Sequence, residues 1–293
     1  MAANPHRRRA VRHPGSMPVV TERDLDMLTL VGLSRYVSTD QLARDFFPST
    51  DRARRRVRKL FDAGLLTVMV VDSAKPNLVA LTRRGLSLLL AREPGLDGRV
   101  GRAGAVRLPA VDHHLAVVDA RTFAAGLASR ERVPLRFESG VGALAAEFGL
   151  PSLPLEPDGI AVFGEAGETT AVGVEVDLGH EGLKVLVAKF ERYAQAFDRG
   201  PLDALWLVVE AGPGRRTSLE AAVAAAGIAP RTTIVALSHL RRRPVVGLPE
   251  AAGEGKKAEG INSPLATHAN QAEIKALPHL RLSAVRRADG RGR

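Results

Sequence analysis

The chain has 293 residues, of which 45% are hydrophobic and 25% charged, and its formal net charge at pH 7 is +10. This composition is typical of a globular protein, and the length suffices for two small domains with separate cores. No run of 18 apolar residues is present, and no apolar segment follows the N-terminal arginines, so we expect neither a membrane protein nor a secreted one. The absence of cysteine excludes disulfides, zinc ribbons and thiol catalysis, and it fits a cytoplasmic protein.

The positive charge is concentrated at the two ends of the chain. Residues 1–60 carry a net charge of +7 and residues 241–293 one of +6, whereas residues 151–240 carry −5. A chain with basic ends and an acidic centre is typical of a polyanion binder. Aromatic residues make up only 4%, which argues against a surface that stacks many bases of a single strand. We therefore expect double-stranded DNA as the partner.

The first third of the chain has the element order of a winged helix-turn-helix. We expect a flexible basic arm over residues 1–18 and the DNA-binding domain over residues 19–92. Within that domain, capping residues and apolar spacing predict three helices, a β-hairpin and a fourth helix, over residues 21–32, 38–47, 49–64, 65–81 and 83–92 respectively.

The third predicted helix carries the strongest functional signal in the sequence. Ala53, Val57, Leu60 and Phe61 have the spacing of a core-facing stripe, and the rest of the surface is basic. The second helix of a helix-turn-helix motif lies in the major groove, where arginine pairs with guanine or phosphate. A solvated basic face is the simpler alternative. With a lysine from the hairpin, the candidate DNA-binding residues are Arg52, Arg54, Arg55, Arg56, Arg58, Lys59 and Lys75.

The remainder of the chain predicts a linker, an α/β domain and a tail. Residues 93–112 are rich in Gly, Arg and Pro, which indicates the linker, and residues 244–293 form a mostly disordered basic tail. Between them, residues 113–243 predict the order αβββαβαβ. Its elements are expected over residues 113–129, 133–137, 160–163, 171–177, 181–197, 205–209, 218–226 and 232–237.

Three acids of this domain form a candidate metal and catalytic site. Asp158 begins one predicted strand, and Glu175 and Asp177 alternate on one side of the next. If these strands pair, the carboxylates can meet around Mg²⁺ or Mn²⁺. The layout resembles the PD-(D/E)xK nucleases, but Asp177 occupies the lysine position, so Lys184 or Lys189 of the following helix would have to supply the cation. The alternative is a set of structural acids on a catalytically dead fold.

A pair of histidines at the start of the second domain has two interpretations. His113 and His114 lie near Asp119, which invites a metal site. Without cysteines or a second matching pair, a position at a helix N-terminus is the simpler account.

Several segments, taken in order, resemble the replication-relaxation family of bacterial plasmids and mobile elements. They read TERDLDMLTLVGLSRYVSTDQLARDFFPS, RARRRVRKLFDAGLL, LTRRG, HHLAVVDAR, PDG and VEVDLGHEGLKVLVAKFERYAQAF. The resemblance implies a DNA-binding protein with a winged helix first and a nuclease-like α/β domain second. It also implies a link with replication or relaxation of plasmid DNA, with replication or mobilisation proteins as further partners.

Three functions remain open at this point. The leading hypothesis is a duplex DNA-binding protein whose nuclease-like domain is catalytically weak or inactive. The second is a magnesium-dependent endonuclease or nickase that uses the acidic cluster. The third is a winged-helix transcriptional regulator whose second domain dimerises or senses a ligand.

Overall fold

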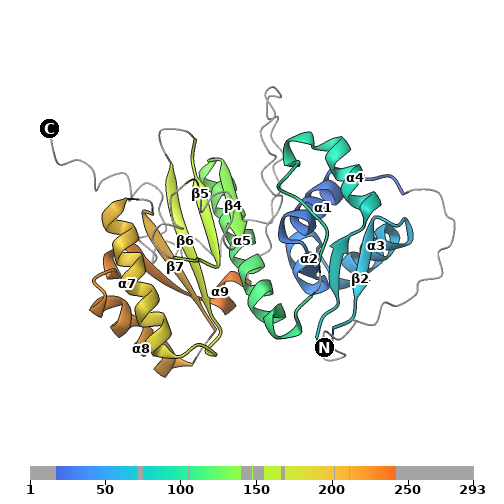
Figure 1. Ribbon diagram of the computed structural model, residues 1–293. Coiled ribbons are helices and arrows are strands. Elements are labelled where there is room, and N and C mark those ends of the chain that lie inside the picture. Colours follow the sequence, from blue (N-terminus) through green and yellow to red (C-terminus); the bar gives the residue numbers. More distant parts are fainter. Residues whose placement is uncertain are drawn as a thin grey trace. The chain divides into compact units, whose positions relative to one another are not determined.

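The computed structural model describes residues 18–71, 75–104, 106–139, 147, 155–165, 169–200, 202–210 and 212–241. The basic arm expected over residues 1–18 and the basic tail expected over residues 244–293 lie outside this part of the chain, apart from residue 18. Within it, the fold is mixed α/β, with two separate sheets and helices around each (Figure 1).

The described chain forms two compact units. The first comprises residues 18–127 with 237–241, and the second comprises residues 128–236. The sequence placed a boundary before residue 113, but the contacts group most of the helix that begins there with the first unit. The reason is apolar packing, because Val118 of that helix belongs to the core of the first unit.

The first unit begins with three helices at the positions that the sequence predicts. They are α1 (Glu22–Ser34), α2 (Thr39–Phe46) and α3 (Thr50–Asp62). Thr21 and Asp24 form a capping box for α1, and Ser38 and Gln41 form one for α2. The Ser49 side chain accepts a hydrogen bond from the Arg52 N–H and caps α3. Local side-chain hydrogen bonds therefore fix where each helix starts.

A small antiparallel sheet and a fourth helix complete the core of this unit. The strands are β1 (Val37–Ser38), β2 (Leu66–Met69) and β3 (Leu78–Leu81), in the order β1-β3-β2. The hairpin was predicted, whereas β1 was not, because a two-residue strand is too short to show a period. Thr82 caps α4 (Arg83–Arg92), and apolar side chains from all four helices and from β1–β3 form one core.

The stretch expected as a linker is partly packed. Leu96 and Val100 are buried in the core of the first unit, and Gly101 lies against the Arg35 side chain. Short 3-10 turns occupy residues 94–96 and 108–110, and α5 (Val111–Glu131) follows. The Gly, Arg and Pro content of this stretch predicted a linker, but two apolar residues, Leu96 and Val100, pack it onto the core.

The second unit is built on a five-stranded sheet in the chain order β4-β5-β6-β7-β8. β4 (Leu135–Ser139), β5 (Gly159–Phe163) and β6 (Thr170–Asp177) are antiparallel neighbours, whereas β7 (Ala204–Val209) and β8 (Thr232–Ala236) run parallel to β6. Parallel neighbours need crossover connections, and α7 (Leu183–Arg199) and α8 (Pro213–Ala225) provide them. The short helix α9 (Leu237–Arg241) ends the described chain.

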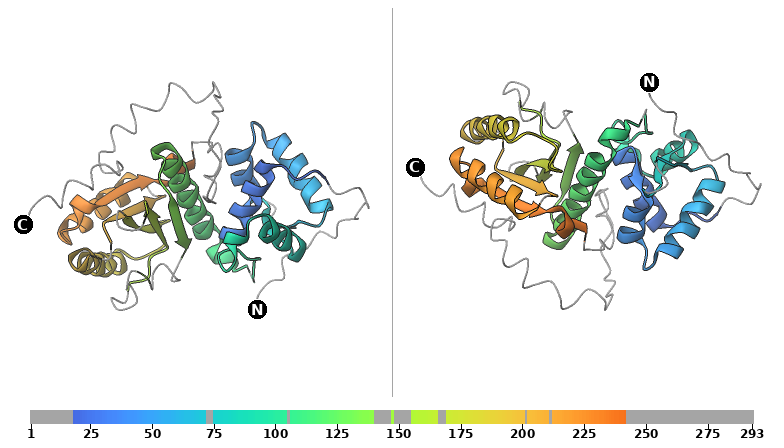
Figure 2. Two further views of the ribbon diagram at one scale, coloured as in Figure 1. Left: turned by 90° about the horizontal axis from the view of Figure 1, so that it is seen from above. Right: turned by 90° about the horizontal axis from the view of Figure 1, so that it is seen from below.

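Both crossover helices cover the same face of this sheet. The two views of Figure 2 show α7 and α8 side by side over the strands, and residues of both helices share one apolar core with β5–β7. α8 begins five residues before the predicted start because Gly212 and Pro213 favour a helix N-terminus. None of the described helices is both long and apolar enough to cross a lipid bilayer.

Candidate nucleic-acid interface and acidic cluster

The basic helix α3 presents most of its positive charge to solvent. Ala53, Val57 and Leu60 are buried on one side of the helix and attach it to the core. The remaining surface is exposed at five of the six candidate positions, which are Arg52, Arg54, Arg55, Arg58 and Lys59. Arg58 differs from the others because it pairs with Asp62 at 3.0 Å and lies over the Phe61 ring.

Arg56 is the exception among the six, because it is tied to the fold. Its guanidinium pairs with both carboxylate oxygens of Asp24 on α1 and donates to the Val19 carbonyl at 2.7 Å. The Asp24 side chain is fully buried and also accepts hydrogen bonds from the Thr21 N–H and hydroxyl. Burial raises the pKa of Asp24, but the Arg56 and Thr21 hydrogen bonds and the Arg56 charge outweigh it, so the pKa lies below its ordinary value.

Lys75, the candidate from the hairpin, has an acidic partner. Its Nζ lies 2.5 Å from a carboxylate oxygen of Asp112, near the start of α5. The pair is exposed, so its contribution to stability is small. Its contact with an acid reduces the charge that Lys75 offers to a DNA backbone.

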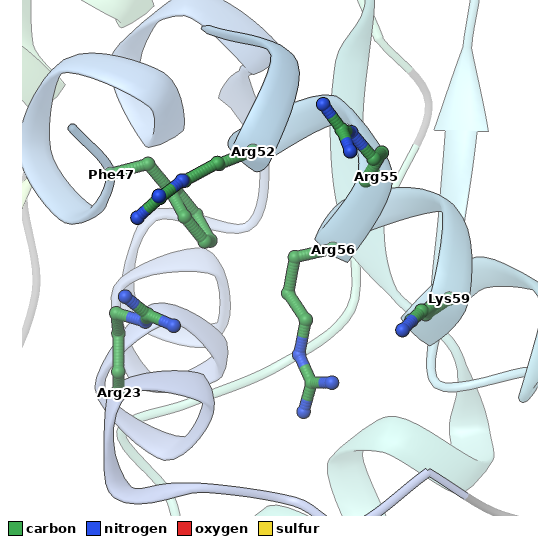
Figure 3. A pocket seen from close by; sticks show the side chains of 6 residues that line it. All are labelled: Arg23, Phe47, Arg52, Arg55, Arg56 and Lys59. Carbon is green, nitrogen blue, oxygen red and sulfur yellow. The ribbon is translucent and has the colours of Figure 1, made fainter. Parts of the chain in front are cut away.

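A surface pocket of about 220 Å³ lies beside the basic helix (Figure 3). Four of its six lining residues come from α3, one comes from α1 and one from the turn before α3. We call it the arginine pocket and define it by Arg23, Phe47, Arg52, Arg55, Arg56 and Lys59. The Arg23 guanidinium lies over the Phe47 ring, 4.9 Å from its centroid. Arg23 and Phe47 were not predicted from the sequence, because neither belongs to the run of basic residues in α3.

In the second unit, the strand register brings two of the candidate acids together. The last pair of the β5–β6 ladder joins Gly159 with Val174, so Asp158 lies opposite Glu175, one residue further on. Side chains that lie opposite each other on antiparallel strands share a face of the sheet. The Asp158 carboxylate accepts a hydrogen bond of 2.8 Å from the Val176 N–H, which fixes its position beside β6.

Glu175 is buried and has partners on both carboxylate oxygens. Lys189 of α7 pairs with one oxygen, and the Tyr193 hydroxyl donates to the other at 2.7 Å. These two partners are four residues apart, so they lie on one side of the helix. Gly173 makes room for the tyrosine, because a Cβ at this position would come within 2.8 Å of the Tyr193 ring. Lys189 was predicted from the sequence and Tyr193 was not, although the i, i+4 spacing of the two residues indicates a shared helix face.

The protonation of this cluster is shifted by burial and by charge. Burial and the nearby Asp158 carboxylate together raise the pKa of Glu175 from 4.5 to about 8, against the opposing effects of Lys189 and Tyr193. Burial lowers the pKa of Lys189, but the Glu175 and Asp158 carboxylates outweigh it and leave the pKa above its ordinary value. Glu175 therefore takes up a proton at a higher pH than an exposed glutamate does, and Lys189 keeps its proton to a higher pH than an exposed lysine does.

Asp177 does not join the other two acids, which corrects the expectation of one three-carboxylate site. Its carboxylate is buried and pairs with Arg215 of α8 through contacts of 2.8 and 3.1 Å. It also accepts a hydrogen bond of 2.9 Å from the Gly179 N–H. Alternation does place Asp177 on the same face of β6 as Glu175, but a cation from a different helix holds it. Lys184 is exposed on α7, and in the part of the chain that the structure describes no ion pair joins it to these acids.

The acids in this arrangement do not fit a resident Mg²⁺ or Mn²⁺ ion. Such an ion needs several anionic oxygen ligands about 2.0 to 2.6 Å away. Both carboxylate oxygens of Glu175 already accept hydrogen bonds, and Arg215 pairs with the Asp177 carboxylate. Lys189 supplies the positive charge that a metal ion would otherwise bring to this site. Among the described residues, no three His, Asp or Glu side chains are grouped to hold a metal ion.

His114, the second residue of the histidine pair, contacts other residues of the first unit. The His114 ring stacks on Tyr36, and its Nε2 lies 3.1 Å from the Tyr36 carbonyl oxygen. Burial lowers the pKa of His114, although hydrogen bonds to backbone carbonyls oppose the shift. Asp119 contacts Gln41 and Arg44 of α2 and Arg241 of α9, so it is not a partner for a metal beside the histidines.

The fold and these sites define a mixed α/β protein that combines an exposed basic helix in one unit with a buried acid and lysine cluster in the other. The sequence model described as replication-relaxation matches residues 28–203, which is more than half of the chain. The protein belongs to the replication-relaxation family. No curated protein matches the chain.

One solved structure gives a distant match. It is titled as the structure of the restriction endonuclease FokI, with 11% sequence identity and a TM-score of 0.31. The match covers 75% of this chain and 42% of that one, so this chain corresponds to less than half of the endonuclease. At this TM-score the likeness carries no argument about fold or activity.

Proposed function

We propose that the first unit is a winged helix-turn-helix domain that binds duplex DNA and serves replication or processing of plasmid or mobile-element DNA. In this assignment α2 and α3 are the helix-turn-helix pair, α3 is the recognition helix and the β2–β3 hairpin is the wing. The membership of the replication-relaxation family supports the biological role.

The order and connection of the elements support this assignment. Residues 47–49 alone separate α2 from α3, which is the short turn that a helix-turn-helix motif requires. The β2–β3 hairpin follows α3 directly, as a wing does. In such domains the recognition helix enters the major groove and its polar side chains contact bases and phosphates.

The observation that carries the proposal is the exposed positive charge of α3. Arg52, Arg55 and Lys59 are exposed, and within the described residues no carboxylate pairs with any of them. A solvated structural helix gains nothing from such a run, because like charges on adjoining turns repel. Duplex DNA, with a negative charge about every 1.7 Å of its axis, compensates this repulsion.

For the second unit we propose a nuclease-like domain that is catalytically weak or inactive. Support comes from the internal pairing of its acids. Glu175 is held by Lys189 and Tyr193, and Asp177 is held by Arg215. Carboxylates with internal partners stabilise a fold but are poor metal ligands, because a cation must first displace those partners.

One observation favours a second candidate, a metal-dependent endonuclease. Lys189 reaches Glu175 and lies near Asp158, so α7 supplies the lysine that is missing two residues after Glu175. A lysine beside two carboxylates can stabilise the charge that develops on a phosphate. The arrangement thus has the residue types of a phosphodiesterase, although the internal pairing opposes activity.

The DNA-binding proposal is tested with two double variants of equal charge. We expect Arg55→Ala with Lys59→Ala to weaken binding to a fluorescent duplex at least tenfold near 100 mM salt, because two phosphate contacts are lost. The control, Arg92→Ala with Arg199→Ala, removes the same charge from the exposed C-terminal ends of α4 and α7. Equal affinity of the two variants, with both folded by circular dichroism, would show that α3 is not the interface.

A plasmid assay separates the two candidates for the second unit. Supercoiled plasmid is incubated with the protein and Mg²⁺ or Mn²⁺, and nicked and linear products are followed on a gel. We expect little or no cleavage. Robust cleavage that disappears in both Asp158→Asn and Lys189→Met would establish the endonuclease and refute the inactive assignment.

A further inference from the structure

We propose that the arginine pocket binds one internal phosphate of duplex DNA and packs the adjoining deoxyribose against Phe47. This inference rests on the DNA binding proposed above, and it assigns separate roles to two parts of the basic surface. The pocket holds the backbone and sets the position of α3 on the duplex, whereas the outward face of α3 meets the bases.

The positive charge around the pocket favours the binding of an anion. Arg23, Arg52, Arg55 and Lys59 have no carboxylate partner among the described residues, and only Arg56 is paired, with Asp24. The lining therefore carries an excess of four positive charges. Guanidinium groups donate in a planar fork that matches two phosphate oxygens, so several arginines around one opening favour a phosphate over a halide or a single carboxylate.

The size of the pocket limits what enters it. Its volume of about 220 Å³ lies below the range of roughly 300 to 1,000 Å³ that is usual for sites of drug-sized ligands. It is nevertheless several times larger than the volume of one water molecule, which is about 30 Å³. A phosphate with part of a sugar suits this space better than a whole nucleotide. Phe47 supplies the one apolar wall, against which the carbon face of a deoxyribose can pack.

The position of the pocket on α3 distinguishes backbone contact from base contact. Arg52, Arg56 and Lys59 follow the i, i+4, i+7 spacing of one flank, and Arg23 faces this flank from α1 (Figure 3). Arg55 lies at the edge of the flank that is nearest the outward face. Arg54 and Arg58 lie on the other flank and do not line the pocket. When a helix lies in the major groove, its flanks run beside the phosphates and its outward face meets the base edges.

Contacts within the fold hold two of the lining side chains in place. The Arg56–Asp24 pair joins α3 to α1, and the Arg23 guanidinium packs on the Phe47 ring. A site that exists before binding loses little side-chain freedom when the phosphate arrives. This favours Arg23 as the residue to test, because it is exposed and is the only lining residue that α1 contributes.

The test compares Arg23→Ala with Arg92→Ala, which removes one exposed arginine elsewhere in the first unit. Affinity for a short fluorescent duplex is measured between about 50 and 200 mM salt. Loss of one phosphate contact lowers the slope of log affinity against log salt by about 0.9, so the advantage of the wild type over Arg23→Ala shrinks about 3.5-fold over this range. Arg23→Lys should restore most of the slope. The loss should be the same for duplexes of unrelated sequence.

A second arm distinguishes a DNA phosphate from free phosphate. The duplex should raise the melting temperature of the wild type more than that of Arg23→Ala, whereas inorganic phosphate at matched ionic strength should leave both unchanged. A rise with submillimolar inorganic phosphate that depends on Arg23 would identify a free-anion site and overturn the assignment.

The remaining outcomes separate this inference from the function on which it rests. If the wild type binds duplex DNA and Arg23→Ala behaves like Arg92→Ala, the phosphate site is wrong and the DNA-binding domain stands. A change of sequence preference in Arg23→Ala would make the pocket a base-reading site instead. If the wild type binds no duplex at all, both proposals fail.

Discussion

Arg56 looks like a DNA-binding residue in the sequence, yet its first role is to neutralise a buried acid. In Arg56→Ala, Asp24 keeps its two hydrogen bonds from Thr21 but loses its ion pair with Arg56, while its side chain stays fully buried. Removal of one partner from a buried ion pair costs about 3 to 5 kcal/mol. Because Thr21 still satisfies the carboxylate in part, we expect a loss of about 3 kcal/mol in the free energy of unfolding.

The matched variant is Arg55→Ala, which removes the same side chain one position away. Arg55 is exposed and has no ion pair among the described residues, so its free energy of unfolding should stay within about 0.5 kcal/mol of the wild type. At roughly 4 °C per kcal/mol for a unit of this size, Arg56→Ala melts about 12 °C below the wild type. Urea titration monitored by circular dichroism measures both values.

The double variant Asp24→Asn with Arg56→Ala tests the cause of that loss. It removes the unpaired charge, so it should be more stable than Arg56→Ala alone. The pKa of Asp24 is lowered in the fold, so its stabilisation is complete well above pH 3.8 and is lost as the pH falls through the lowered pKa. The reasoning is wrong if Arg56→Ala is as stable as Arg55→Ala, or if the double variant is the least stable of the three.

Two further predictions concern the acids of the second unit. The pKa of Glu175 is raised from 4.5 to about 8, so its contribution to stability is complete below pH 4.5 and declines from there to pH 8. The melting temperature of Glu175→Gln relative to the wild type should therefore rise between pH 5 and pH 8, and a constant difference would contradict the assignment. Arg215→Ala leaves Asp177 buried without its cation and should cost about 2 to 4 kcal/mol in urea titrations. The exposed control Arg216→Ala should lower the free energy of unfolding by less than about 0.5 kcal/mol. Equal losses in Arg215→Ala and Arg216→Ala would argue against a stabilising role of the buried pair.

Local sequence signals determined most of the secondary structure. Capping residues such as Thr21, Ser38 and Ser49 act over three positions, so they can be read directly from the chain. The exposed basic face of α3 was predictable for the same reason, because the spacing of three buried apolar residues defines which side faces solvent. Alternation along β6 also placed Glu175 and Asp177 on one face.

The partners of those charged groups were decided by the tertiary structure alone. Arg56 meets an acid 32 positions earlier in the chain, and Asp177 meets an arginine 38 positions later. Neither sequence separation produces a periodic pattern in the chain. Such contacts depend on how α1 and α3 pack in one core and on how α8 packs on the sheet. Local sequence patterns therefore determined that the chain carries a basic helix and that Glu175 and Asp177 share one face of a strand. Packing and strand register decided which cations neutralise those acids and which cations stay exposed for a ligand.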